Sequence, residues 1–76
     1  MKQIMLSPND ILRKYRQEKG ISLLRMSESL GYNTLQAYAN VEYGRTKLSF
    51  DVACKAADVL GIEVKDLLRE NHKRKV

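Results

Sequence analysis

The stretch SLLRMSESLGYNTLQAYANVEYG, residues 22–44, is the most informative part of the chain because it holds two short amphipathic segments separated by a glycine. In the first segment Leu23, Met26 and Leu30 recur three and then four residues apart. That spacing places them on one face of a helix over residues 23–30.

The ends of both segments carry recognisable helix signals. Ser22 is a suitable N-cap because its hydroxyl accepts from a free N–H of the first turn. Gly31 predicts a helix stop because glycine adopts the positive φ that follows many helix ends. Either Asn33 or Thr34 can cap the second helix, which ends before Gly44.

The second segment predicts a helix to about Glu42 or Tyr43, with Tyr38 and Val41 as its inward pair and Ala37 beside them. Two helices joined by a glycine turn, the second carrying small polar residues outward, form the pattern of a helix-turn-helix.

The flanking sequence predicts three more helices. One begins at Ser7 and Pro8, a cap followed by a proline at the first helical position, and runs to about residue 18 or 19. Another opens at Ser49 and stops at Gly61, and a short one covers about residues 64–69. The expected buried residues of these three helices are Ile11, Leu12, Tyr15, Ala53, Ala56 or Ala57, Leu60, Leu67 and Leu68. Arg13, Lys14 and Gln17 are expected to face outward.

These 76 residues fit a single all-α domain of five helices, with a structured core over about residues 7–69. Residues 1–6 either fray or pack across the domain, and residues 70–76 are expected to form a flexible basic tail. The apolar run at the amino end is too short for a signal peptide, and no run reaches the ~20 apolar residues of a membrane span. A cytoplasmic protein without membrane contact is expected.

Charge points to the class of partner and argues against catalysis. A net charge of +5 favours a polyanion, although excess Lys and Arg can also serve solubility alone. The single cysteine, Cys54, excludes an intramolecular disulfide and is expected in the core. The single histidine, His72, falls in the tail. We therefore expect no catalytic residues, no metal site and no cofactor.

The chain resembles the phage lambda repressor and Cro family of helix-turn-helix proteins, also called the XRE family. The resemblance covers roughly residues 11–68. The matching residues, in order, are Arg16, Gly20, Met26-Ser27, Leu30-Gly31, residues 34–41, Glu42-Tyr43-Gly44-Arg45, Leu60-Gly61-Ile62 and Leu67-Leu68.

The resemblance implies a sequence-specific regulator of transcription, expected to be a repressor, that inserts residues 34–42 into the DNA major groove. The implied base-reading residues are Thr34, Leu35, Gln36, Ala39 and Asn40. The amides of Gln36 and Asn40 each offer the donor and acceptor that adenine requires, and Leu35 can touch a thymine methyl.

Phosphate contacts are expected to flank the reading helix. The candidates are Arg25, Asn33, Tyr43, Arg45 and Lys47. For Arg25, an ordinary solvent-exposed position on the helix is an equal alternative to a phosphate contact. Tyr43 and Tyr32 can lie against the DNA backbone or cover the edge of the core.

Three features depart from many relatives. No Lys or Arg lies between Thr34 and Tyr43, and one extra residue separates Gly31 from Glu42. Leu23 is apolar where relatives often carry a polar phosphate-contacting residue. These departures leave open which residues of the reading helix point into the groove.

The resemblance also implies an ion pair between Arg16 and Glu42 that fixes the angle of the reading helix. A homodimer through the last two helices is expected, because one reading helix buries little surface on DNA; a monomer is its alternative. The alternative function is a protein-interaction module, such as an antitoxin or a phage regulator that acts through a partner protein.

Overall fold

The computed structural model describes residues 7–68, which form five helices and no strand. The helices are α1 (Pro8–Glu18), α2 (Leu23–Ser29), α3 (Leu35–Glu42), α4 (Phe50–Leu60) and α5 (Val64–Leu68). The predicted all-α class is confirmed. The lead-in of residues 1–6 and the predicted tail of residues 70–76, with His72, lie outside the described residues.

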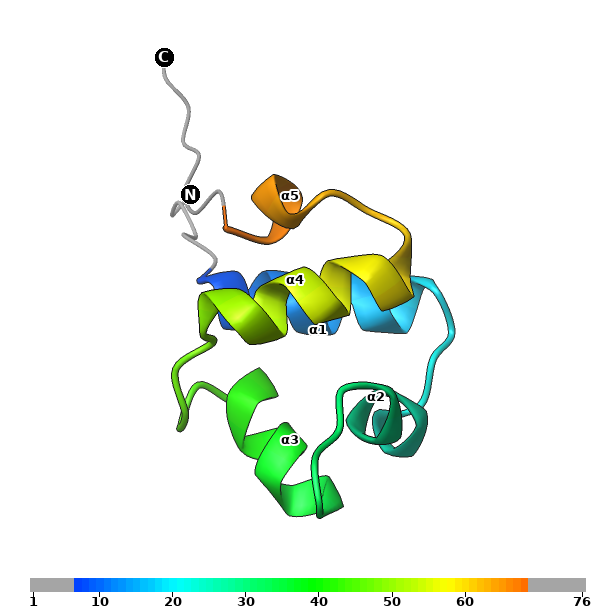
Figure 1. The fold of residues 1–76 in the computed structure, drawn as a ribbon, viewed down its shortest axis with the longest axis vertical. Helices are drawn as coiled ribbons and strands as arrows, with labels where there is room; N and C mark the ends of the chain where they lie inside the picture. The colour runs from blue at the N-terminus through cyan, green and yellow to red at the C-terminus, as the bar shows by residue number, and fades with distance from the viewer. Residues whose placement is uncertain (1–6, 69–76) are drawn as a thin grey trace, which may run out of the picture.

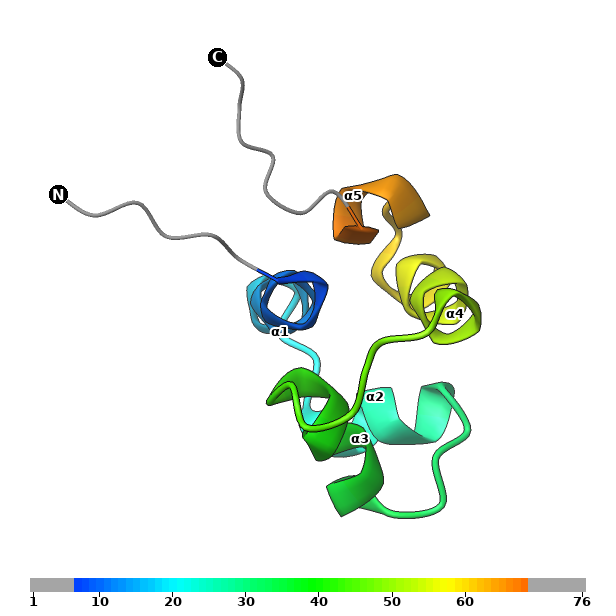
Figure 2. The ribbon, with the colours of Figure 1, turned by 90° about the vertical axis from the view of Figure 1, so that its left-hand side faces the viewer.

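Two central helices separate the helix-turn-helix from the last helix. Figures 1 and 2 show α1 and α4 side by side across the middle, α5 on one side of them, and α2 and α3 on the other. Helix α3 packs against both α1 and α2, so its orientation depends on two neighbours.

Four of the helices begin at a hydroxyl side chain that caps them. Ser7, Ser22, Thr34 and Ser49 each accept a hydrogen bond from the backbone N–H three residues later. At Ser7 the cap is reciprocal, because Asp10 accepts from the Ser7 backbone N–H at 3.2 Å. Thr34, rather than Asn33, is the cap of α3.

The core is aliphatic with one buried tyrosine. Its buried members are Ile11, Leu12, Met26, Leu30, Tyr38, Val41, Leu48, Ala53, Ala56, Ala57, Leu60 and Leu67. Burial of this apolar surface supplies the main driving force for folding.

Three residues expected in the core lie at its edge instead. Tyr15 and Leu68 are only partly buried against it. Cys54 is partly exposed, because the buried stripe of α4 runs through Ala53, Ala57 and Leu60 and a residue next to Ala53 falls on its flank.

Among residues 7–68, no helix has the length and apolar character needed to cross a bilayer.

Candidate nucleic-acid interface

The turn between α2 and α3 is closed by backbone and side-chain hydrogen bonds. Gly31 has φ of 82°, and the N–H groups of Gly31 and Tyr32 donate to the carbonyls of Glu28 and Ser27 at 3.1 and 3.0 Å. These two hydrogen bonds end α2, and they require a residue in the left-handed conformation, which glycine tolerates. The buried Ser27 hydroxyl donates to the Thr34 carbonyl at 3.3 Å, which ties α2 to the start of α3.

The carboxyl end of α3 is held by three polar residues of α1, Asn9, Arg13 and Arg16, which we call the α1 polar face. Asn9 Nδ2 donates to the carbonyls of Val41 at 2.6 Å and Thr46 at 3.2 Å. Arg13 Nη1 donates to the carbonyl of Glu42 at 3.0 Å. These donors satisfy carbonyls that the end of a helix leaves unpaired, and the arginine charge also complements the helix dipole.

The predicted ion pair between Arg16 and Glu42 is present and nearly buried. Arg16 Nε lies 2.6 Å from Glu42 Oε2, and Arg16 Nη2 lies 3.2 Å from Oε1. The two side chains are 11% and 1% exposed. Arg16 Nη1 also donates to the Ile21 carbonyl at 2.7 Å, so one guanidinium joins α1, the loop after it and α3.

Tyr38 completes the environment of the Glu42 carboxylate. Its hydroxyl donates to Glu42 Oε2 at 2.6 Å, and its ring lies 5.7 Å from that of Tyr32 between centroids. Burial, followed by the hydrogen bond to Glu42, raises the pKa of Tyr38 far above its ordinary value. The hydroxyl therefore stays protonated and remains a donor at neutral pH.

The outer surface of α3 is narrower than the sequence predicts. Thr34, Leu35 and Gln36 are exposed and Asn40 is half-buried. The prediction that Ala39 lies on the outer face is wrong, because this residue is buried, with only 8% exposed. The physical reason is that α1 and α2 both pack on α3, so the buried arc includes Tyr38, Ala39, Val41 and Glu42 instead of one inward pair.

The predicted phosphate-contacting residues are all exposed, on α2, in the turn before α3 and at or after the end of α3. Arg25 is exposed on α2, and Asn33 is exposed in the turn before α3. Tyr43, the C-cap of α3, is 59% exposed, and Arg45 and Lys47 are exposed in the loop that follows.

Arg13, for which the sequence predicts only an outward position on the first helix, lies against Tyr43 of this group. Its guanidinium carbon lies 5.8 Å from the centre of the Tyr43 ring, and that of Arg45 lies 5.9 Å from the same ring. Both contacts are in cation–π range. The sequence does contain a signal for this role. Asn9, Arg13 and Arg16 are spaced four and then three residues apart, which places all three on one face of the helix.

Within residues 7–68 no three His, Cys, Asp or Glu side chains gather in a way that could hold a metal ion. The structure instead presents α3 at the surface, held by the α1 polar face, with Thr34 and Gln36 exposed and with Arg13 and Arg45 beside its carboxyl end.

The fold and this surface together define a DNA-binding domain of the helix-turn-helix class. A family model described as helix-turn-helix matches residues 12–67, and the chain belongs to this family, in its lambda repressor and Cro-like (XRE) form. Proteins of this family are DNA-binding regulators of transcription. A comparison with curated proteins found no match.

Proposed function

We propose that this protein is a sequence-specific repressor that binds double-stranded DNA with α3 in the major groove. The observation that carries the proposal is the outer surface of α3, where Thr34, Leu35 and Gln36 are exposed while the opposite side is fixed by α1. A reading helix must be held rigidly for its side chains to reach base edges. Repression requires only that the bound domain occlude its site.

The test is selection of bound sequences from random DNA duplexes, followed by titration of the selected site at two salt concentrations with competitor DNA. A specific regulator selects a defined site and resists competitor, and its affinity falls steeply with salt. Binding that any competitor removes would contradict the proposal, as would failure to select any sequence.

Lys47 offers a prediction about the phosphate contacts. Lys47→Ala is expected to weaken binding to all sequences alike and to reduce the log–log salt slope by about 0.9, because one phosphate contact is lost. The measurement is fluorescence anisotropy over a series of salt concentrations.

The matched control for Lys47 is Lys14→Ala, which removes the same charge from an exposed position on α1, where the Lys14 Nζ lies 4.0 Å from Glu18 Oε2. An equal slope change in both variants would show that net charge alone, and not a contact at Lys47, governs binding.

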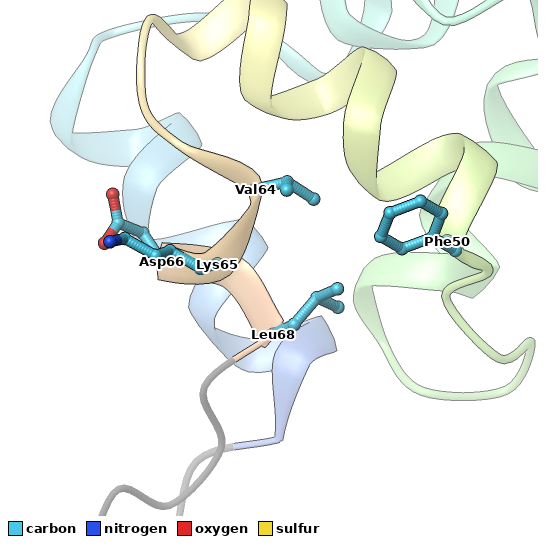
Figure 3. Close-up of a pocket in the computed structure, with 5 residues that line it drawn as sticks. All are labelled: Phe50, Val64, Lys65, Asp66 and Leu68. Carbon is cyan, nitrogen blue, oxygen red and sulfur yellow. The ribbon is translucent and has the colours of Figure 1, made fainter.

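We further propose a homodimer through α4 and α5, which would place two reading helices about 34–36 Å apart on a near-palindromic site. An apolar hollow of about 580 Å³ lies between these helices, lined by Phe50, Val64 and Leu68 with Lys65 and Asp66 at its margin. Figure 3 shows the Val64 and Leu68 side chains directed toward the Phe50 ring. Phe50 is 63% exposed, and together with Val64 and Leu68 it forms a contiguous apolar surface of the kind that protein interfaces use.

A second copy is the proposed occupant because α3 has only 8 residues, and single reading modules bury only about 600–1,000 Å² on DNA. Phe50→Asp is expected to convert a dimer to a monomer at micromolar concentration in analytical ultracentrifugation, since the charge would have to be desolvated in the contact.

Leu24→Asp is the control for Phe50, because Leu24 is also exposed, at 55%, but lies on α2. It should leave the dimer intact. A wild-type protein that sediments as a monomer throughout, or a Phe50→Asp variant that still dimerises, would contradict this interface.

A protein-interaction module, such as an antitoxin or a phage regulator, is the second candidate function. The exposed leucines of α2 and α3, Leu24 at 55% and Leu35 at 44%, favour it because apolar side chains suit a protein partner as well as a thymine methyl. Failure to bind any duplex in the selection above would favour this candidate.

A further inference from the structure

The two amide side chains on the outer surface of α3 are joined to each other and to Arg45. Asn40 Oδ1 accepts from Gln36 Nε2 at 2.9 Å. The same oxygen accepts from Arg45 Nη1 at 3.4 Å. Three side chains therefore meet at one atom, Asn40 Oδ1.

The guanidinium of Arg45 fixes the direction of both hydrogen bonds. Arginine carries donors only, so the Asn40 atom that faces it must be the oxygen and not the amide nitrogen. Gln36 must then turn its own amide nitrogen toward that oxygen. The polarity of all three side chains follows from the chemistry of Arg45.

Arg45 is itself held in place by the turn that ends α3. Gly44 has φ of 81°, and the Arg45 backbone N–H donates to the Asn40 carbonyl at 2.9 Å, which returns the chain toward Asn40. The Arg45 guanidinium also lies against the Tyr43 ring. Its position beside Asn40 therefore rests on backbone as well as side-chain contacts.

These bonds leave the two amides with different free groups. The Asn40 oxygen is occupied, so Asn40 presents mainly its Nδ2 donor. Gln36 keeps its Oε1 acceptor and one N–H, which are the two groups that pair with N6 and N7 of adenine. The sequence predicts that Gln36 and Asn40 can each pair with an adenine, and this arrangement of hydrogen bonds does not fit that prediction.

We propose that Gln36 alone reads adenine and that Asn40, held by Arg45, is the positioning residue that orients it. This inference rests on the proposed function and specifies its reading mechanism. It predicts one adenine preference in each half-site from this pair, governed by both residues, instead of two independent ones.

The experiment is sequence selection from random duplexes with the wild type, Gln36→Ala, Asn40→Ala, Asn40→Asp and the double variant Gln36→Ala/Asn40→Ala. Gln36→Ala is expected to reduce discrimination at one A·T pair by about 5- to 150-fold, the value of one bidentate contact. Asn40→Ala should reduce discrimination at the same base pair, and the double variant should lose no more there than Gln36→Ala does.

Asn40→Asp separates orientation from a merely structural role. Its carboxylate still accepts from Gln36 and Arg45, so the adenine preference should persist even though the added negative charge weakens binding to all sequences. Thermal melts of all variants identify any loss of folded protein.

The outcomes distinguish this inference from the function on which it rests. Loss of preference at a different base pair in Asn40→Ala, or an unchanged preference in that variant, would overturn the positioning role while leaving DNA recognition intact. Loss of the preference in Asn40→Asp would also overturn it. A wild type that selects no sequence would overturn the proposed function and this inference together.

Discussion

Replacing Glu42 by alanine is expected to lower the melting temperature by about 12–40 °C, because removing one partner of a buried ion pair costs about 3–5 kcal/mol. The carboxylate is 1% exposed and accepts from Arg16 and from the Tyr38 hydroxyl. Alanine removes the acceptor of the Tyr38 hydroxyl and of Arg16 Nε and Nη2, and leaves the Arg16 guanidinium with its bond to the Ile21 carbonyl alone. Since a domain of this length has a stability of only roughly 4–11 kcal/mol, the expected loss is a large share of the free energy of unfolding.

The control for Glu42 is Glu18→Ala, which changes the net charge equally at an exposed carboxylate 4.0 Å from Lys14. Surface pairs of this kind contribute about 0–1 kcal/mol, so its melt should shift by a few degrees at most. Circular dichroism measures both variants. Equal shifts would show that the Arg16–Glu42 pair does not brace the fold.

A double replacement tests whether the cost comes from the unpaired charge. Arg16→Met combined with Glu42→Met removes both charges and keeps apolar volume, so it should be more stable than Glu42→Ala alone. The same double variant should still lose DNA affinity, because the angle of α3 would no longer be fixed by a directional contact.

Met26→Ala is the second large effect that we expect, a loss of about 2–5 kcal/mol in the free energy of unfolding. The Met26 side chain is fully buried, at 0% exposed, in the first helix of the helix-turn-helix. Alanine removes its contacts and leaves a cavity between α2 and the rest of the core. Urea denaturation measures the loss.

Leu24→Ala in the same helix provides the matched control, because Leu24 is 55% exposed. Its free energy of unfolding should change by well under about 1 kcal/mol, as at most surface positions. Similar losses in the two variants would contradict the packing described for α2. DNA affinity of Met26→Ala should fall in proportion to its folded fraction.

The bracing of α3 gives these stability effects a functional meaning. Every polar residue of the α1 polar face donates to the carboxyl end of α3 or to the loop after it, and that loop carries Arg45 and Lys47. The contacts that stabilise the domain are therefore also the contacts that position its candidate DNA surface. We expect variants of Asn9 and Arg13 to affect stability and DNA affinity together.

The helices can be predicted from the amino-acid sequence, because their start and stop signals lie in nearby residues. Hydroxyl caps at Ser7, Ser22 and Ser49 and the glycine stops at Gly31 and Gly44 act within one helical turn, so local spacing is enough to locate them. The periodic apolar residues of these helices likewise predicted most of the core, and family resemblance supplied the Arg16–Glu42 pair.

Which side of α3 is exposed depends on the packing of the folded domain and cannot be predicted from the sequence. Burial of Ala39 depends on α1 and α2 both packing against α3, and neither contact is visible in the periodicity of eight residues. The roles of Asn9 and Arg13 also depend on carbonyls more than two dozen positions away along the chain. The polarity of Gln36 and Asn40 follows from Arg45, which contacts Asn40 across the turn at Gly44. Helix formation is a local property of the chain, whereas the exposure and hydrogen-bonding state of a side chain depend on what packs beside it.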